Sequence, residues 1–178
     1  MLKSFIASAF LLIACGSSIN ENKTESLISE INNTNSISVS IDSSFPPEDI
    51  IQIREAMAEW NYAIDNTIFV ESNTGVMIWN VPTHPFGDKS VLGWSDEESN
   101  IELFMDRIDN KNITTKSIVL HELGHHLFIG FDSTHHLDHG LMSLTSDGIY
   151  TWDCIDQYTV DVICETTDLC GDNAAGTC

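Results

Sequence analysis

The segment His121-Glu122-Leu123-Gly124-His125 combines residue types that can bind and use a metal ion. Histidines four positions apart lie one turn apart on one face of a helix, where both imidazoles can bind one zinc ion. Glu122 lies beside His121, near the metal without having to bind it. Zinc polarises a peptide carbonyl and acidifies water, and Glu122 can move that water's proton to the leaving amine. The pattern predicts a zinc-dependent endopeptidase; an exposed helix turn with two ordinary histidines is the alternative.

A helix must hold these side chains. Thr114 or Thr115 can cap its start, and the apolar periodicity continues to about Phe128. We expect the helix to be amphipathic, with the metal ligands on one side and a buried apolar face on the other. Gly124 is unfavourable inside a helix and therefore indicates close packing at that point. The buried face would carry Leu120, Leu123 and Leu127.

The elements before this helix predict an α+β domain. Residues 37–41 alternate apolar and polar side chains, as a half-buried strand does. Pro46, Pro47 and the acidic residues after them indicate a helix start, and further strands are expected over 67–71, 75–81 and 100–106. A short last helix is expected over 156–164, with Asp156 and Thr159 at its cap. The apolar stripe of the first helix would be Ile50, Ile53, Met57, Trp60 and Ile64.

The N-terminal residues have the features of an export signal. Lys3 precedes ten apolar or small residues that end at Ala14, followed by Cys15. This arrangement resembles a bacterial lipoprotein signal, in which the cysteine becomes the lipidated N-terminus; an ordinary secretory signal is the alternative. We therefore expect a signal peptide over 1–14, a lipidated Cys15 with a flexible tether over 15–36, and a domain over 37–178. The protein would be anchored through this lipid in the bacterial cell envelope, on the outer membrane or the cell surface, or be released from it.

Charge and cysteine content restrict the partners and the compartment. The formal net charge of −20 argues against a nucleic-acid partner, because phosphates would be repelled. The four cysteines other than Cys15 lie in the last 25 residues, which in an exported chain predicts two disulfides. Three connectivities are possible, and a second zinc site is the alternative. These residues are Cys154, Cys164, Cys170 and Cys178.

Several segments together resemble the metzincin zinc peptidases, in particular matrixin-like bacterial members. The segment 119–127 is similar to their zinc helix, and Gly140-Leu141-Met142-Ser143 is similar to their Met-turn. Residues 37–61, 92–94 and 100–103 resemble their N-terminal strand and helix and their edge-strand region. The resemblance implies a twisted mixed sheet with an N-terminal helix and a zinc helix, and a small C-terminal subdomain with the Met-turn and a final helix. A peptide substrate would lie extended along the edge strand.

The chain departs from this family where the third zinc ligand is expected. The family continues with a glycine and then a histidine or aspartate, whereas Phe128 and Phe131 occupy these positions here. Phenylalanine cannot bind zinc, so a longer loop must supply the ligand, with Gly130 making the turn. His135 is our preferred third ligand. The alternatives are His136, His139 and Asp132, or no ligand from this loop.

Two further interpretations remain open. Asp96-Glu97-Glu98 is acidic enough to attract calcium, but its spacing matches no EF-hand and a solvated turn is the simpler explanation. The chain could also be a catalytically inactive lipoprotein of metzincin fold that binds a partner or captures zinc. Glu122 argues for catalysis, since metal binding alone does not need a base at that position.

Overall fold

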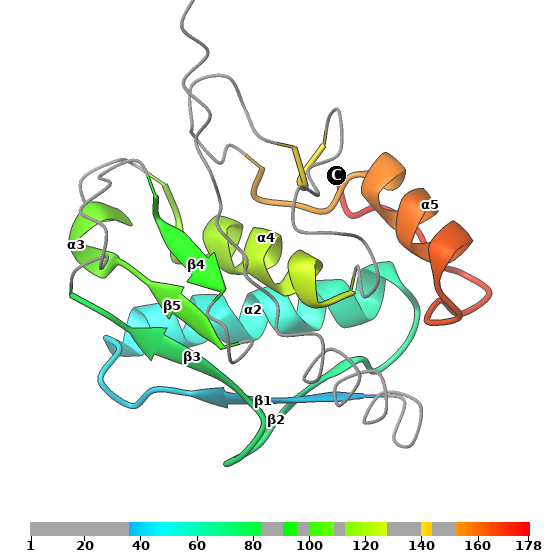
Figure 1. Ribbon diagram of the computed structural model, residues 1–178. Coiled ribbons are helices and arrows are strands. Elements are labelled where there is room, and N and C mark those ends of the chain that lie inside the picture. The colour runs from blue at the N-terminus through cyan, green and yellow to red at the C-terminus, as the bar shows by residue number, and fades with distance from the viewer. Residues whose placement is uncertain (1–35, 83–90, 96–99, 109–112, 128–139, 144–151) are drawn as a thin grey trace, which may run out of the picture.

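The computed structural model describes residues 36–82, 91–95, 100–108, 113–127, 140–143 and 152–178. Within these residues the chain forms an α+β domain with a five-stranded, mostly parallel sheet and four helices (Figure 1). The elements are β1 (Ile37–Ile41), α2 (Pro47–Ala63), β2 (Phe69–Glu71), β3 (Val76–Asn80), β4 (Gly93–Ser95), β5 (Ile101–Leu103), α3 (Met105–Ile108), α4 (Thr115–Leu127) and α5 (Gln157–Thr166).

The strand order of the sheet is β2-β1-β3-β5-β4. Strand β1 pairs in parallel with both β2 and β3, and β3 pairs in parallel with β5. Strand β4 is antiparallel to β5 and occupies the end of this order. The mixed sheet predicted from the sequence is therefore present, and its single antiparallel pair lies at the edge beside α4.

One face of the sheet carries the apolar side chains of the core. The register aligns Val39 with Val76 and Ile78 with Ile101, and all four side chains are buried. The same register places Gly93 of β4 opposite Leu103. On the other face Val70 and Trp79 are 40% and 41% exposed. This alternation follows from the period of two along a strand, so Gly93 and Ser95 face the core.

Helices α2 and α4 lie side by side against the sheet (Figure 1). Helix α2 begins with proline at its first position and acidic residues in its first turn, and its predicted stripe is buried at Ile53, Met57 and Trp60. The indole Nε1 of Trp60 donates a hydrogen bond of 2.9 Å to the carbonyl oxygen of Leu120. This buried contact ties the centre of α2 to the middle of α4.

The predicted helix starts are confirmed, and one predicted strand is too long. The Thr114 hydroxyl accepts a hydrogen bond of 3.1 Å from the backbone N–H of Ser117, which caps α4. Asp156 accepts one of 3.0 Å from the N–H of Thr159 and caps α5. The strand expected over 100–106 ends at Leu103, and helix α3 begins at Met105. The apolar run of Leu103, Phe104 and Met105 crosses this boundary, so the hydrophobic pattern alone does not locate it.

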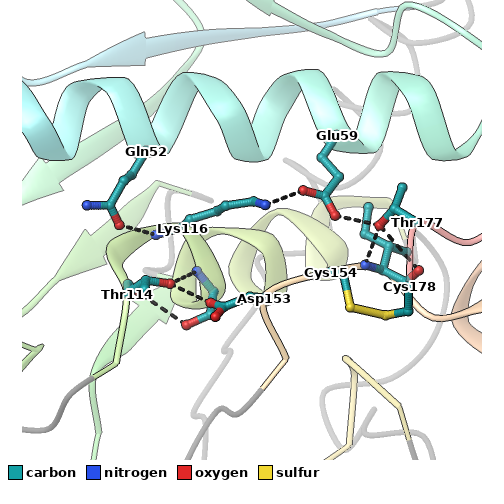
Figure 2. Close-up of polar contacts among 10 residues, drawn as sticks. Gln52, Glu59, Thr114, Lys116, Asp153, Cys154, Thr177 and Cys178 are labelled. Atoms are coloured by element: carbon teal, nitrogen blue, oxygen red, sulfur yellow. Dashed lines mark hydrogen bonds and ion pairs between the residues drawn. A yellow bond between two sulfur atoms is a disulfide. The ribbon is translucent and has the colours of Figure 1, made fainter.

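Two disulfides join the C-terminal residues, as the cysteine count predicted. The pairs are Cys154–Cys178 and Cys164–Cys170, which settles the connectivity that the sequence left open. The first bond holds the C-terminal residue beside the segment that leads into α5, close to α2 and α4 (Figure 2). Two disulfides are typical of proteins outside the reducing cytosol. Among the described helices, none has the length and apolar character needed to cross a membrane.

Candidate metal centre

The predicted pair of ligands is brought together on α4. The Nε2 atoms of His121 and His125 are 3.2 Å apart, and the two rings are nearly perpendicular. Two Zn–N bonds of about 2.05 Å at a tetrahedral angle set their nitrogen atoms about 3.3 Å apart. The spacing of the two nitrogens therefore suits two ligands of one zinc ion. In the metal-free chain the same distance allows a hydrogen bond between the rings.

A backbone carbonyl orients His121. Its Nδ1 lies 2.8 Å from the carbonyl oxygen of Leu141, in the turn 140–143. Because a carbonyl only accepts hydrogen bonds, Nδ1 carries the proton and the lone pair of the neutral ring is on Nε2. Histidines that bind metals commonly have their second ring nitrogen held in this way. The contact thus selects the tautomer that a zinc ligand at Nε2 needs.

Glu122 is buried next to the histidine pair, against the edge strand. Its side chain is 1% exposed, and burial raises its pKa to about 8. The Ser95 hydroxyl donates a hydrogen bond of 3.4 Å to Oε2 of Glu122, which opposes this rise. A Cβ atom on Gly93 would lie 2.6 Å from Oε1. The carboxyl group therefore fits against β4 only because residue 93 has no side chain.

The turn 140–143 packs against α4 at His121 and Gly124. Its backbone closes with a hydrogen bond of 3.1 Å from the N–H of Ser143 to the carbonyl of Gly140, which has a φ of +84°. Met142 is fully buried, and a Cβ atom on Gly124 would meet its Sδ atom. The prediction of close packing at Gly124 is thus confirmed. The methionine lies against the helix between the two histidines.

Helix α4 is buried on its apolar side and also on the side that carries the predicted ligands. Leu120, Leu123 and Leu127 are buried as predicted, but His121 and Glu122 on the other side are buried as well. The side that carries the histidines is covered by β4 and by the turn 140–143, as the contacts of Glu122 and His121 demonstrate. A helix enclosed on all sides carries polar groups inward only where they have partners or a function.

The remaining predicted site residues lie outside the described part of the chain. These are the preferred third ligand His135, its alternatives and the acidic segment considered for calcium. Within the described ranges, no cluster of three or more His, Cys, Asp or Glu side chains is arranged to hold a metal ion. The two nitrogens of His121 and His125 fit zinc as donors, and a third donor must come from elsewhere. The alternatives for the third ligand are His136, His139 and Asp132, and the calcium candidates are Asp96, Glu97 and Glu98.

Three supporting groups had not been identified from the sequence. They are the Leu141 carbonyl at His121, the Ser95 hydroxyl at Glu122 and the carboxylate of Asp156, which accepts a hydrogen bond of 2.7 Å from the Leu141 N–H. The sequence does not show which backbone carbonyl will face a histidine. A serine in a short strand likewise has no sequence pattern that indicates a role at the site. Asp156 caps α5 as predicted, and its second contact, with the Leu141 N–H, is not indicated by the capping pattern.

Comparisons with known proteins leave the family open. Neither a protein-family model, nor a curated protein, nor a solved structure matches this chain.

Proposed function

We propose that this protein is a zinc-dependent endopeptidase in which His121 and His125 bind the metal and Glu122 is the general base. The observation that carries the proposal is the 3.2 Å separation of the two Nε2 atoms, with the Nδ1 of His121 held by the Leu141 carbonyl. Two nitrogens at the spacing of tetrahedral zinc, one with its tautomer fixed, suit a metal site. His135 is our proposed third ligand.

Zinc, when bound, supplies a Lewis acid for the peptide carbonyl and acidifies water. Glu122 then takes up a proton and returns it to the leaving amine, and its position on α4 next to His121 suits both transfers. Burial keeps competing water from the carboxyl group, and the Ser95 hydroxyl orients its Oε2 atom. A cation bound beside the carboxyl group would favour its charged form, which is the form that accepts a proton.

The substrate would bind along β4. This strand is the last in the described sheet order and pairs on one side with β5. An extended peptide can add to the other side through backbone hydrogen bonds. Gly93 in this strand lies against Glu122, so a peptide paired there would pass close to the base. We therefore propose an unfolded or extended protein segment as the substrate class, in a metzincin-like domain.

We further propose, from the signal-like N-terminal sequence, that the protein is anchored in the bacterial cell envelope through a lipid on Cys15. The two disulfides support an oxidising compartment. An inactive module that captures zinc would use the histidines alone. The burial of a glutamic acid between the edge strand and the histidine helix has a catalytic explanation but none in simple zinc capture.

The test measures zinc per chain and cleavage of casein by the protein purified with both disulfides formed. We expect one zinc ion in the wild type, loss of zinc in His125→Ala, and retained zinc with at least a hundredfold loss of cleavage in Glu122→Gln. Single alanine variants of His135, His136, His139 and Asp132 identify the third ligand, because only its removal lowers zinc content.

Two outcomes would contradict the proposal. A wild-type protein that binds no zinc excludes both the peptidase and the zinc-capturing module. Stoichiometric zinc without cleavage of casein or of the protein's own chain favours the capturing module instead.

A further inference from the structure

The four consecutive residues before α5 together contact three different parts of the molecule. We call Asp153–Asp156 the clasp segment. Asp153 accepts a hydrogen bond of 2.6 Å from the Thr114 hydroxyl at the start of α4, and Cys154 is bonded to Cys178 (Figure 2). Ile155 is fully buried. Asp156 accepts the hydrogen bond of the Leu141 N–H. The clasp segment thus reaches the metal helix, the C-terminus and the turn beneath the histidines.

Hydrogen bonds join the C-terminal residues to the clasp segment. The N–H of Thr177 donates to the carbonyl of Ile155 at 2.7 Å, and the N–H of Ile155 donates to the Thr177 hydroxyl at 2.8 Å. That hydroxyl in turn donates to Oε1 of Glu59 on α2 at 2.5 Å, and Oε2 of Glu59 pairs with the Lys116 ammonium on α4 (Figure 2). One carboxylate therefore links α2, α4 and the C-terminal residues next to the clasp segment.

A continuous series of contacts leads from the clasp segment to the histidine pair. Asp156 holds the N–H of Leu141 at 2.7 Å, and the carbonyl of the same residue accepts from the Nδ1 of His121 at 2.8 Å. The preceding residue, Gly140, has a φ of +84°, and a Cβ atom there would lie 2.5 Å from both carboxylate oxygens of Asp156. The turn is therefore in close contact with Asp156, next to the carbonyl that accepts the hydrogen bond of His121.

We infer that Asp156 is a positioning residue for the metal centre, and that the Cys154–Cys178 disulfide keeps it in position. This inference rests on the proposed zinc site. Asp156 acts on His121 through Leu141, whose carbonyl fixes the tautomer and the ring orientation of the histidine. Because the bonds at Asp156 join the turn to the cap of α5, the C-terminal end of the chain becomes part of the support of the zinc site.

The experiment compares two ways of loosening Asp156 with matched controls. Asp156→Ser keeps a hydroxyl that can cap α5 but is too short to reach Leu141 as well. Loss of a group that orients a metal ligand typically weakens metal binding about 10–100-fold. We expect zinc affinity, measured by competition with a chromophoric chelator, to fall within this range in Asp156→Ser. Cys154→Ala/Cys178→Ala should weaken zinc binding in the same direction, and Cys164→Ala/Cys170→Ala, which removes the other disulfide, should leave it within about twofold.

A second readout separates positioning from general loss of stability. Cobalt substituted for zinc reports ligand geometry through its visible absorption, and we expect this spectrum to change in Asp156→Ser but not in Cys164→Ala/Cys170→Ala. Circular dichroism below the unfolding temperature of each variant verifies that α5 is intact. If Asp156→Ser does not fold, Thr177→Val takes its place, because it removes the hydroxyl that accepts a hydrogen bond from Ile155 of the clasp segment.

A measurement on the metal-free protein distinguishes failure of this inference from failure of the proposed function. Nitrogen-15 NMR of labelled histidines reports the tautomer of His121. We expect a protonated Nδ1 in the wild type and a mixture of tautomers in Asp156→Ser. An unchanged tautomer and unchanged zinc affinity in this variant would overturn the inference. Absence of zinc binding in the wild type would overturn the proposed function, while the tautomer would still test the role of Asp156.

Discussion

Gly93 of the edge strand lies so close to Glu122 that a Cβ atom on it would be 2.6 Å from Oε1 and 2.9 Å from Cγ. The same Cβ atom would be 2.9 Å from Cγ2 of Ile118, one turn earlier on α4. The strand and the helix therefore approach as closely as a glycine permits. This approach encloses the carboxyl group that we propose as the base.

Gly93→Ala should displace Glu122 and lower activity more than zinc binding. The new methyl group has no space, and overpacking of this kind destabilises a protein by about 1–3 kcal/mol. We expect cleavage of casein to fall at least tenfold while the protein still binds one zinc ion, because the atoms nearest to the added methyl group belong to Glu122 and Ile118. Leu92→Val in the same segment is the control for a general packing change, and comparable losses in both variants would contradict a specific role for Gly93.

Gly124→Ala should destabilise the protein although alanine favours helix. The gain in helix propensity is about 1 kcal/mol. Against it, the added Cβ would meet Sδ of Met142 and lie 3.2 Å from Cζ2 of Trp60, and both side chains are fully buried. Overpacking of about 1–3 kcal/mol should exceed the gain. Urea denaturation checks this, and Gly124→Ala/Met142→Ala should couple favourably in a double-mutant cycle. Simple additivity of the two changes would count against contact between these residues.

Much of the fold could be predicted because it depends on local patterns. The alternation over β1, the apolar stripe of α2 and the capping residues Thr114 and Asp156 each determine a nearby element. The histidine pair on α4 follows from helical geometry in the same way. Such features involve residues a few positions apart, so they can be predicted from the spacing of residue types along the sequence.

What could not be predicted depends on contacts between distant residues. The helical pattern separates the histidine side of α4 from its apolar side, but it does not show that β4 and the turn 140–143 cover the histidine side. The disulfide pairing, the contacts of the clasp segment and the contacts of the C-terminal residues join parts of the chain that are distant in sequence. Glu59 and Thr177, for example, are 118 positions apart. Several arrangements of these residues satisfy the same local pattern, and only packing of the whole domain selects one.

Asp49 has both a local role that the sequence indicates and a distant contact that it does not. Its position in the first turn of α2 indicates a favourable charge at a helix start, but its side chain is buried and accepts a hydrogen bond of 2.6 Å from the Thr115 hydroxyl at the start of α4. Asp49→Ala leaves that hydroxyl buried without its acceptor, so we expect a loss of about 1–3 kcal/mol in the free energy of unfolding. Thermal or urea denaturation measures it.

Two further variants test this explanation of Asp49. Asp49→Ala/Thr115→Val removes both polar groups and should recover part of the loss, since no buried donor remains unsatisfied. Arg54 lies on the same helix as Asp49 and forms an exposed ion pair with Glu71 of β2, and Arg54→Ala should leave the free energy of unfolding nearly unchanged. If the double variant were no more stable than Asp49→Ala, the buried hydrogen bond would not be the cause.

The raised pKa of Glu122 predicts how the stability of the metal-free protein depends on pH. Burial raises this pKa from 4.5 to about 8, so between these values the folded protein binds a proton that the unfolded chain releases. The contribution of Glu122 is therefore fully present below the unfolded pKa and is lost as pH rises through the folded pKa, with a slope of at most about 1.4 kcal/mol per pH unit.

Glu122→Gln cannot titrate and lacks this slope. Urea denaturation in the presence of a chelator, from about pH 5 to about pH 8, should show the stability of the wild type falling relative to that of Glu122→Gln. The other carboxylates titrate in both proteins and cancel in the difference, so parallel curves would mean that Glu122 is not buried in its protonated form.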